Sequence, residues 1–203
     1  MIKTLIFDLG NVIVNVDENK FFEKAAINGS KTVSCVKKYF ESSPSRKAFE
    51  RGKISTRQFY HKIAADLNLK MGFDEFKNAW CGIFTLNKNV ERFIKNVKKD
   101  FKLVLLSNTD ALHFGHIKNK FKIVNDFDEH VLSYKVGYRK PNPLIFLNAL
   151  KKAGTAPFNC VYVDDIPQFV YVARLMGIKS FQYRNFEKFV DDLRTVNVVA
   201  KGL

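Results

Sequence analysis

Acidic, hydroxyl and lysine side chains follow the apolar runs of this sequence at regular places. Asp8 ends the first apolar run, Ser107 and Asn108 end a second, Asp164-Asp165 end a third, and Lys140 precedes a proline. Three carboxylates held close together repel one another unless a divalent cation lies among them, and their hard oxygen atoms suit Mg²⁺. A lysine in such a cluster offsets the negative charge and can hold a phosphate oxygen.

Each of these residues also has a structural explanation when it is taken alone. An Asp or a Ser-Asn-Thr segment after a strand is often the N-cap of the next helix, and Lys-Pro is common in solvated loops. Their order favours a shared site, because ligands of an open parallel sheet bind beyond the carboxyl ends of its strands.

The elements that must position these residues alternate between buried strands and helices. Continuous apolar strands separated by helices form a parallel sheet that is covered on both faces. The expected strands are 3–8, 101–108, 130–133, 160–165 and 178–182, and the expected helices are 90–97, 110–119, 141–153, 167–176 and 186–195. We therefore expect a doubly wound, Rossmann-like α/β core.

The segment between the first two of these strands has a different texture. Its apolar residues recur at spacings of three and four, which is typical of amphipathic helices that pack on one another. Ser55 and Gln58 have the pattern of a capping box and should begin one of these helices. We expect a core made of 1–15 and 88–203, with a helical cap at 16–87 inserted after the first strand.

The net charge of +14 raises the question of a polyanionic partner. The basic residues are 26 Lys and only 8 Arg, spread along the chain, and arginine is the better residue for bidentate phosphate recognition. We expect a solvated lysine-rich surface and no nucleic-acid partner. A nucleic-acid-binding module stays an alternative, and it would show steeply salt-dependent binding.

Other features of composition bound the class of protein. A chain of 203 residues that is 46% hydrophobic can form a globular core, and it contains no apolar run long enough to span a membrane. The first apolar run contains Asp8 and lacks a cleavage site, unlike a secretory signal. Cys35, Cys81 and Cys160 are widely spaced, so we expect reduced, buried thiols in a cytoplasmic protein. Monomer and dimer both stay open.

Four segments together resemble the motifs of the haloacid dehalogenase-like hydrolases. They are Asp8-Leu-Gly-Asn-Val, Leu106-Ser-Asn-Thr, Gly137-Tyr-Arg-Lys-Pro and Val163-Asp-Asp. Their order matches the family, and the helical insert falls where members with a small α-helical cap carry theirs. Phe49-Glu-Arg-Gly-Lys-Ile-Ser looks like a segment of those caps. The first motif is most similar to a bacterial subgroup that includes sugar-phosphate phosphatases.

The resemblance implies a Mg²⁺-dependent phosphatase that acts on a small phosphorylated metabolite, such as a sugar phosphate. In this family, Asp8 would attack phosphorus and form an aspartyl-phosphate, with Lys140 as its catalytic partner. The metal would be held by Asp8, the Gly10 carbonyl and Asp165, with Asp164 binding directly or through water. The phosphate-binding residues implied are Ser107, Asn108, Lys140 and Asn11.

The sequence departs from the family pattern at Gly10, where many members carry a second Asp as general acid and base. A backbone metal contact survives this change, but proton transfer needs another group, such as Asp17 or a water. The alternative is a weak or inactive member that binds phosphate or a partner. Asn15 and Phe169 also replace frequent polar residues of the family. Candidates for substrate selection in the cap are Arg46, Arg51 and Trp80.

Overall fold

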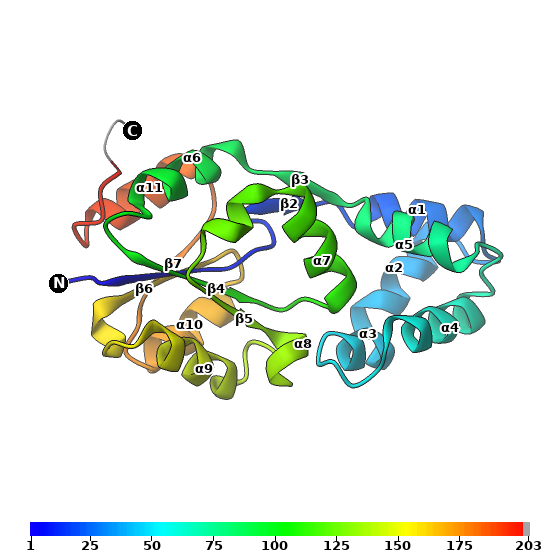
Figure 1. Ribbon diagram of the computed structural model, residues 1–203. Helices are drawn as coiled ribbons and strands as arrows, with labels where there is room; N and C mark the ends of the chain where they lie inside the picture. The colour runs from blue at the N-terminus through cyan, green and yellow to red at the C-terminus, as the bar shows by residue number, and fades with distance from the viewer. Residues whose placement is uncertain (201–203) are drawn as a thin grey trace.

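The computed structural model describes residues 1–200, and its centre is a parallel five-stranded sheet between two layers of helices (Figure 1). The strand order is β5-β4-β1-β6-β7. The strands are β1 Thr4–Phe7, β4 Lys102–Ser107, β5 Glu129–Leu132, β6 Cys160–Asp164 and β7 Lys179–Gln182. The predicted doubly wound α/β fold is confirmed.

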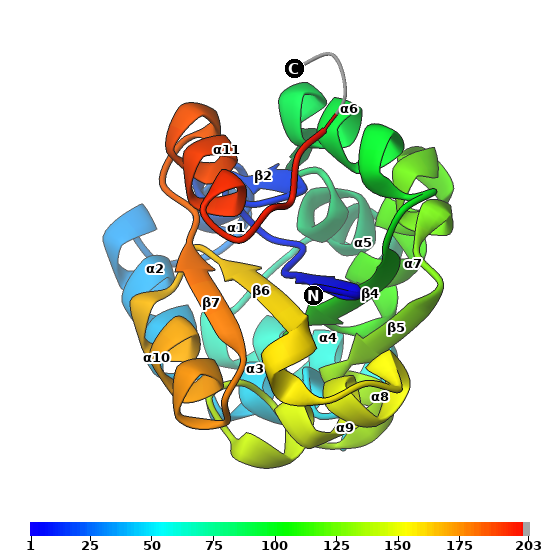
Figure 2. The same ribbon diagram turned by 90° about the vertical axis from the view of Figure 1, so that its left-hand side faces the viewer.

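Successive side chains of the central strand, β1, point to opposite faces of the sheet, so they belong to two different parts of the core. Leu5 and Phe7 belong to a cluster that includes residues of α6 (Lys88–Val97) and α11 (Phe186–Arg194). Ile6, between them in sequence, belongs to a second cluster with α9 (Pro143–Ala153) and α10 (Pro167–Leu175). Figure 2 shows these helix pairs on opposite sides of the sheet. The strands are apolar on both faces because both are covered.

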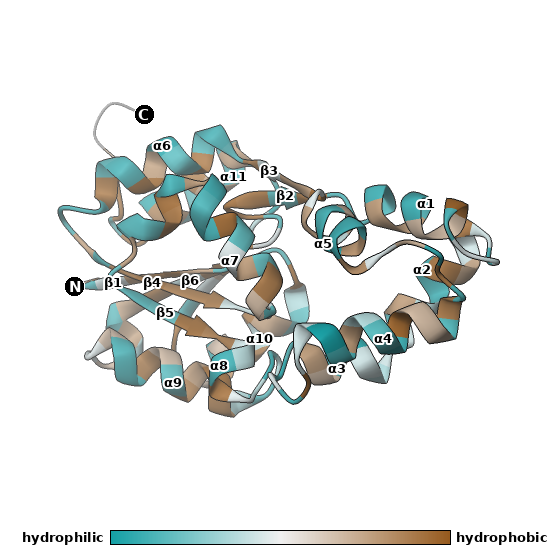
Figure 3. Cartoon of the chain, turned by 45° about the vertical axis from the view of Figure 1, so that its right-hand side comes forward, coloured by the Kyte–Doolittle hydropathy of each residue, from teal (hydrophilic) through white to brown (hydrophobic). Residues whose placement is uncertain are grey.

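The remaining elements complete the two helical layers and the insertion. They are α1 Asn19–Ile27, α2 Val33–Ser42, α3 Pro44–Phe49, α4 Thr56–Leu67, α5 Phe73–Cys81, α7 Ala111–Lys120, α8 Ser133–Val136, and the short 3-10 helices Lys122–Asp126 and Pro157–Asn159. The helix expected at 141 begins two residues later, because the Asn142 side chain accepts the Leu144 N–H and caps it. In Figure 3 the outer helix surfaces are mostly hydrophilic, and the strands between them are hydrophobic.

Helices α1–α5 lie between two short strands, β2 (Val14–Val16) and β3 (Phe84–Leu86), which pair antiparallel. The strand β3 falls inside the segment that we expected to be helical throughout. That expectation was wrong there, because three residues are too few to show an alternating pattern in the sequence. The two strands form a ribbon through which the chain leaves and re-enters the core.

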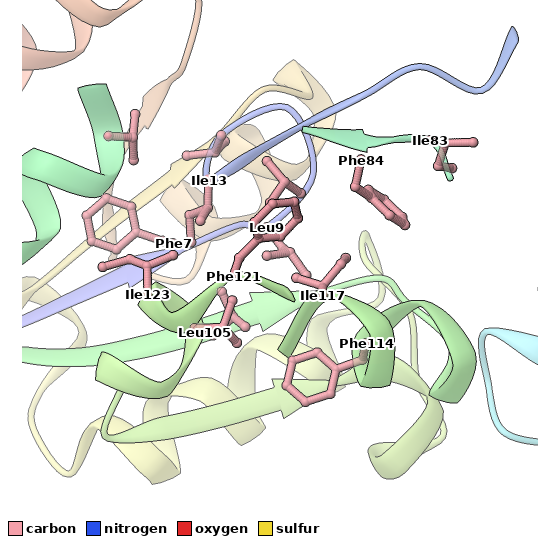
Figure 4. Close-up of a cluster of buried hydrophobic side chains, with 14 of the residues drawn as sticks. Phe7, Leu9, Ile13, Ile83, Phe84, Leu105, Phe114, Ile117, Phe121 and Ile123 are labelled. Atoms are coloured by element: carbon pink, nitrogen blue, oxygen red, sulfur yellow. The ribbon is translucent and has the colours of Figure 1, made fainter. Parts of the chain in front are cut away.

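The helices of the insertion pack around a group of aromatic rings. The ring centroids of Phe21 and Trp80 lie 4.9 Å apart, and those of Phe49 and Phe59 lie 4.4 Å apart. The predicted capping box of α4 is present, with Ser55 and Gln58 each bonded to the backbone of the other. The same buried cluster continues from the insertion to the sheet, α7 and β3, where Phe7, Leu105, Ile117 and Phe84 are buried (Figure 4).

The cysteines differ in part from expectation. Cys81 and Cys160 are buried thiols, whereas Cys35 is exposed in the first turn of α2, on the solvent side. All three are free of disulfide bonds within residues 1–200. None of the helices described in this range has the length and hydropathy needed to cross a membrane.

Candidate active site

The carboxyl ends of three neighbouring strands bring the predicted site together. In the sheet register, Phe7 stands opposite Leu105 on one side and Val163 on the other. Asp8 follows Phe7 directly, and its N–H donates to the Val163 carbonyl at 2.9 Å. Ser107 and Asp164, the last residues of β4 and β6, therefore lie beside Asp8 at one edge of the sheet.

Lys140 is the cation at the centre of this edge. Its Nζ lies 2.8 Å from Asp8 Oδ1 and 2.6 Å from Asp164 Oδ2, and its side chain is 1% exposed. Burial lowers the pKa of Lys140, but the charges of Asp8 and Asp164 outweigh it and raise that pKa above its ordinary value. Lys140 is therefore a permanent positive charge between two carboxylates.

The backbone of Lys140 is fixed by Asn108. The Lys140 N–H donates to Asn108 Oδ1 at 2.7 Å, and Asn108 Nδ2 donates to the Lys140 carbonyl at 3.0 Å. The Asn108 side chain thus joins the end of β4 to the lysine loop. We expected Asn108 to bind phosphate. The Asn108 side-chain amide is instead bonded to the Lys140 backbone, so the Asn108 main chain is the part that stays available to a ligand.

Asp8, Asp164 and Asp165 each offer an oxygen, and these oxygens lie within 4.8 Å of one another. The two oxygens of Asp164 have protein donors: Lys140 and the Tyr162 hydroxyl at Oδ2, and the Ile166 N–H at Oδ1. On Asp8, Leu9 and Lys140 both donate to Oδ1. Asp8 and Asp165 therefore keep oxygens that can face a cation.

The carboxylates stand in an environment that disfavours negative charge. Burial raises the pKa of Asp8 to about 8; Lys140 opposes this shift, and Asp164 and Asp165 add to it. Burial also raises the pKa of Asp165, which a hydrogen bond from Asn11 partly offsets. Each further negative charge at this edge is unfavourable unless a cation compensates it.

Asn11 contacts the acidic pair. Its backbone is left-handed, with φ of 53°, and its Nδ2 donates to Asp165 Oδ2 at 3.1 Å. Its Oδ1 accepts the Val16 N–H at 3.1 Å. Asn11 therefore orients Asp165 in this structure, and the phosphate contact that the resemblance implies for Asn11 stays a prediction.

Sequence reasoning missed Tyr162. It is fully buried in β6, and its hydroxyl donates to the Asp164 oxygen that also receives Lys140. Burial and the nearby carboxylates raise the pKa of Tyr162 well above its ordinary value, so the hydroxyl keeps its proton. The signal available in the sequence was a tyrosine inside an apolar strand, two residues before an acid, whose hydroxyl needs a buried partner.

A cavity of about 480 Å³ opens from these residues toward the insertion. Ser107 lines it, and the Ser107 side chain makes no hydrogen bond to another residue within 1–200. Of the predicted selection residues, Arg46 lines the cavity, whereas Arg51 is exposed outside its lining and Trp80 is buried in the aromatic core. Phe169 lines the cavity too, with its ring centroid 5.1 Å from Lys140 Nζ.

Gly10 also lines the cavity, and the position has room for a side chain. A Cβ built there would meet Val16 Cγ2 at 3.4 Å, an ordinary van der Waals contact. Glycine is therefore not required at this position by crowding. Asp17, the alternative proton donor, lines the same cavity with its side chain 51% exposed.

A parallel sheet that carries a carboxylate cluster and a buried lysine at its carboxyl edge defines an α/β protein with a candidate cation and anion site. The sequence model of the haloacid dehalogenase-like hydrolases matches residues 2–168, and the chain belongs to that family. The predicted family and the predicted enzyme class, a hydrolase, are confirmed.

One relative is similar in sequence over nearly the whole chain, and two solved structures are similar in fold. D-ribitol-5-phosphate phosphatase of Bacteroides thetaiotaomicron is 26% identical, over 97% of this chain and 98% of its own length. The fold is similar to a solved family enzyme of the same organism, in complex with magnesium and inorganic phosphate (TM-score 0.82, 24% identity, 91% and 95% coverage). It is also similar to a predicted family hydrolase of Porphyromonas gingivalis (TM-score 0.82, 21% identity, 97% and 98% coverage).

Proposed function

We propose that this protein is a Mg²⁺-dependent phosphatase that hydrolyses a small sugar or polyol phosphate through an aspartyl-phosphate on Asp8. The observation that carries the proposal is the contact of buried Lys140 with Asp8 and Asp164, beside a third carboxylate, at one end of a cavity. The family assignment and the phosphatase relative support it.

The donor set fits Mg²⁺. Three carboxylates within 4.8 Å provide hard oxygen ligands, and a cation would offset the burial and the neighbouring carboxylates that raise the pKa of Asp8. Asp8 and Asp165 would hold the ion with the Gly10 carbonyl, whereas the occupied oxygens of Asp164 favour a contact through water. When bound, the ion supplies positive charge that draws nucleophile and phosphate together.

The chain's own residues carry the chemistry. Asp8 attacks phosphorus, its oxygen bonds to the phosphoryl group, and the bond to the leaving alkoxide breaks. Lys140 and the Ser107 hydroxyl bind the phosphoryl oxygens as charge spreads over them. Water then hydrolyses the aspartyl-phosphate, which regenerates Asp8 and releases phosphate. The products are one alcohol and one phosphate for each water consumed.

The leaving alkoxide needs a proton, and Gly10 cannot give one. Asp17, at the cavity wall, or a water takes this role in the proposal. General acid help contributes roughly 10²–10⁴-fold, so a substrate with a good leaving group depends on it less. The second candidate function is an inactive phosphate-binding member of the family, and Gly10 is the observation that favours it.

The helical insertion is proposed as the cap that covers the site, with 16–87 as the cap and 1–15 plus 88–203 as the core. The β2–β3 ribbon supports this division, because the chain crosses between the two parts there. Cavity residues come from both parts, including Arg46 of α3 and Lys140 of the core. A closed insertion would exclude water and contact the leaving group.

A substrate panel with Mg²⁺ separates the two candidate functions. The panel comprises ribitol 5-phosphate, glycerol 3-phosphate, ribose 5-phosphate and acetyl phosphate, with released phosphate as the readout. A phosphatase releases phosphate from at least one of them, and a chelator abolishes the release. If the wild type is silent on all of them and Gly10→Asp, whose Cβ would meet only an ordinary contact, turns over, the natural protein is a binding protein.

A further inference from the structure

A chain of alternating charges runs along one part of the cavity wall. Glu18 pairs with Arg46, Arg46 Nε lies 2.9 Å from Glu50 Oε1, and Arg139 Nε lies 2.5 Å from Glu50 Oε2. All four residues line the cavity, and we call them the wall network. Three belong to the insertion side and one, Arg139, directly precedes Lys140.

The wall network bridges the insertion and the core. Glu50 follows the last residue of α3, Glu18 precedes the first residue of α1, and Arg139 lies in the loop between α8 and α9. The turn after Glu50 packs on the backbone of α8, where a Cβ on Gly52 would fall 2.2 Å from the Tyr134 carbonyl. Figure 3 shows α3 beside α8. The network is therefore held from both sides.

Within the network, the positive charges are already compensated. Two carboxylates serve two guanidinium groups, and the Glu50 side chain is only 8% exposed. Burial opposes the charge of Arg46, but Glu50 and Glu18 raise the pKa of Arg46 above its ordinary value. A charged Glu50 between two arginines leaves the wall with no net charge to offer a ligand.

Anionic and uncharged leaving groups should therefore bind beside the wall network with different affinity. A second anionic group against the wall would compete with Glu18 and Glu50 for Arg46 and Arg139, and weakening the pairing of a buried carboxylate is unfavourable. A hydroxyl donates and accepts hydrogen bonds, so it can bond to the carboxylates or the guanidinium groups without displacing either. Lys37 also lines the cavity with no carboxylate within 4.0 Å in residues 1–200, but it is exposed and its charge is screened by solvent.

We propose that the wall network selects phosphomonoesters whose leaving group is an uncharged polyol and disfavours those with a second anionic group, and that Glu50 sets this preference. The inference rests on the proposed phosphatase function and specifies its substrate class.

Two matched pairs of substrates test the selection in the wild type. Ribitol 5-phosphate and 5-phosphoribonate differ in one terminal group, a hydroxymethyl against a carboxylate, and glycerol 3-phosphate and 3-phosphoglycerate differ in the same way. We expect kcat/KM with Mg²⁺ to be at least about tenfold higher for the polyol of each pair that reacts, a difference of about 1.4 kcal/mol. Equal values, or a preference for the carboxylate, would overturn the proposal.

The variant Glu50→Gln tests whether Glu50 causes the preference for the polyol. It keeps the shape of the side chain and frees Arg139 for a ligand, so we expect the polyol-to-carboxylate ratio to fall by about tenfold, mainly through a lower KM for the carboxylate. Glu50→Asp keeps the charge and should keep most of the preference. A proportional loss on both substrates would show that Glu50 is only structural.

Controls separate this outcome from general effects. Asp66→Asn also removes one negative charge from the insertion, at an exposed residue outside the cavity whose carboxylate accepts from Tyr39, and it should leave the ratio unchanged. If Glu50→Gln does not fold, Glu18→Gln frees one side of Arg46 and should move the ratio in the same direction by a smaller factor. If no phosphate is released from any substrate, acetyl phosphate included, the proposed function fails rather than the selection.

Discussion

At the residue scale, the site combines three carboxylates with one lysine. Lys140 compensates Asp8 and Asp164 directly, while Asp165 is held by the neutral amide of Asn11. Burial raises the pKa of Asp8 to about 8, and the charges of Asp164 and Asp165 add to this shift against the opposing charge of Lys140. A phosphate ester, itself an anion, could not approach this cluster unless a cation joined it.

The raised pKa of Asp8 predicts that Mg²⁺ binding releases a proton. The raised pKa of Asp8 favours the protonated carboxyl group in the metal-free protein, and a carboxyl group must lose its proton to bind a metal. We expect a net release of protons when Mg²⁺ binds near neutral pH, and an apparent affinity that rises with pH. Titration calorimetry in two buffers of different ionisation enthalpy measures both, and binding without proton release would contradict the shift.

The sequence predicted the cluster of carboxylates and Lys140, but it did not predict the side-chain contacts that hold these residues in place. Asp8, Ser107, Lys140 and the Asp164–Asp165 pair come together because each ends or precedes an element at the same sheet edge. The sequence could not show that the Asn108 side chain would hold Lys140, because a side-chain contact depends on local loop geometry. The pair Glu50–Arg139 was missed for a similar reason, since 89 positions separate two residues that only the folded insertion brings together.

At the element scale, the turn between α3 and α4 holds the insertion against the core. Gly52 has φ of +67°, a conformation that favours glycine, and any Cβ there would lie 2.2 Å from the Tyr134 carbonyl. The close approach of the two backbones therefore depends on this one glycine.

Replacing this glycine should weaken the contact with α8. We expect Gly52→Ala to lower the free energy of unfolding by about 1–3 kcal/mol, because the left-handed backbone and the short contact are both unfavourable for alanine. Chemical denaturation measures the change. Gly115→Ala is the matched control, since it lies inside α7 with nothing within 4 Å of its Cβ and should be neutral or slightly stabilising. Equal effects of the two substitutions would contradict this role.

The elements themselves were predictable where their patterns were long. The apolar runs before Asp8, Ser107 and Asp164 became β1, β4 and β6, and the helix spacing between them was correct to within a few residues. The strand β3 was not predicted, because it has three residues and is defined by its pairing with β2 rather than by its own sequence pattern. Exact bounds depended on caps, such as Asn142 at the start of α9.

At the scale of the whole molecule, the net charge of +14 contrasts with the acidic cluster at the carboxyl edge of the sheet. The lysines that surround the core are therefore not part of the proposed chemistry. A cationic surface raises the rate at which anionic ligands encounter a protein, which gives the charge a second explanation beside solubility.

Steering by this surface predicts a dependence on ionic strength. We expect kcat/KM for a phosphate ester to fall several-fold as salt rises from about 20 to 300 mM at constant free Mg²⁺, with kcat changed little. Steady-state kinetics across this range provide the measurement. A flat profile would show that the lysines serve only as a solvated coat.

The central claim is that Asp8 is the nucleophile of a Mg²⁺-dependent phosphatase, and phosphate release by the wild type and by Asp8→Asn tests it most directly. The substitution keeps the size of the side chain but removes the attacking oxygen anion, so we predict a loss on the order of 10³-fold or more in kcat on the best substrate of the panel. A folded Asp8→Asn variant that keeps the wild-type rate, or a wild type that releases no phosphate from any substrate with Mg²⁺ present, would contradict the account.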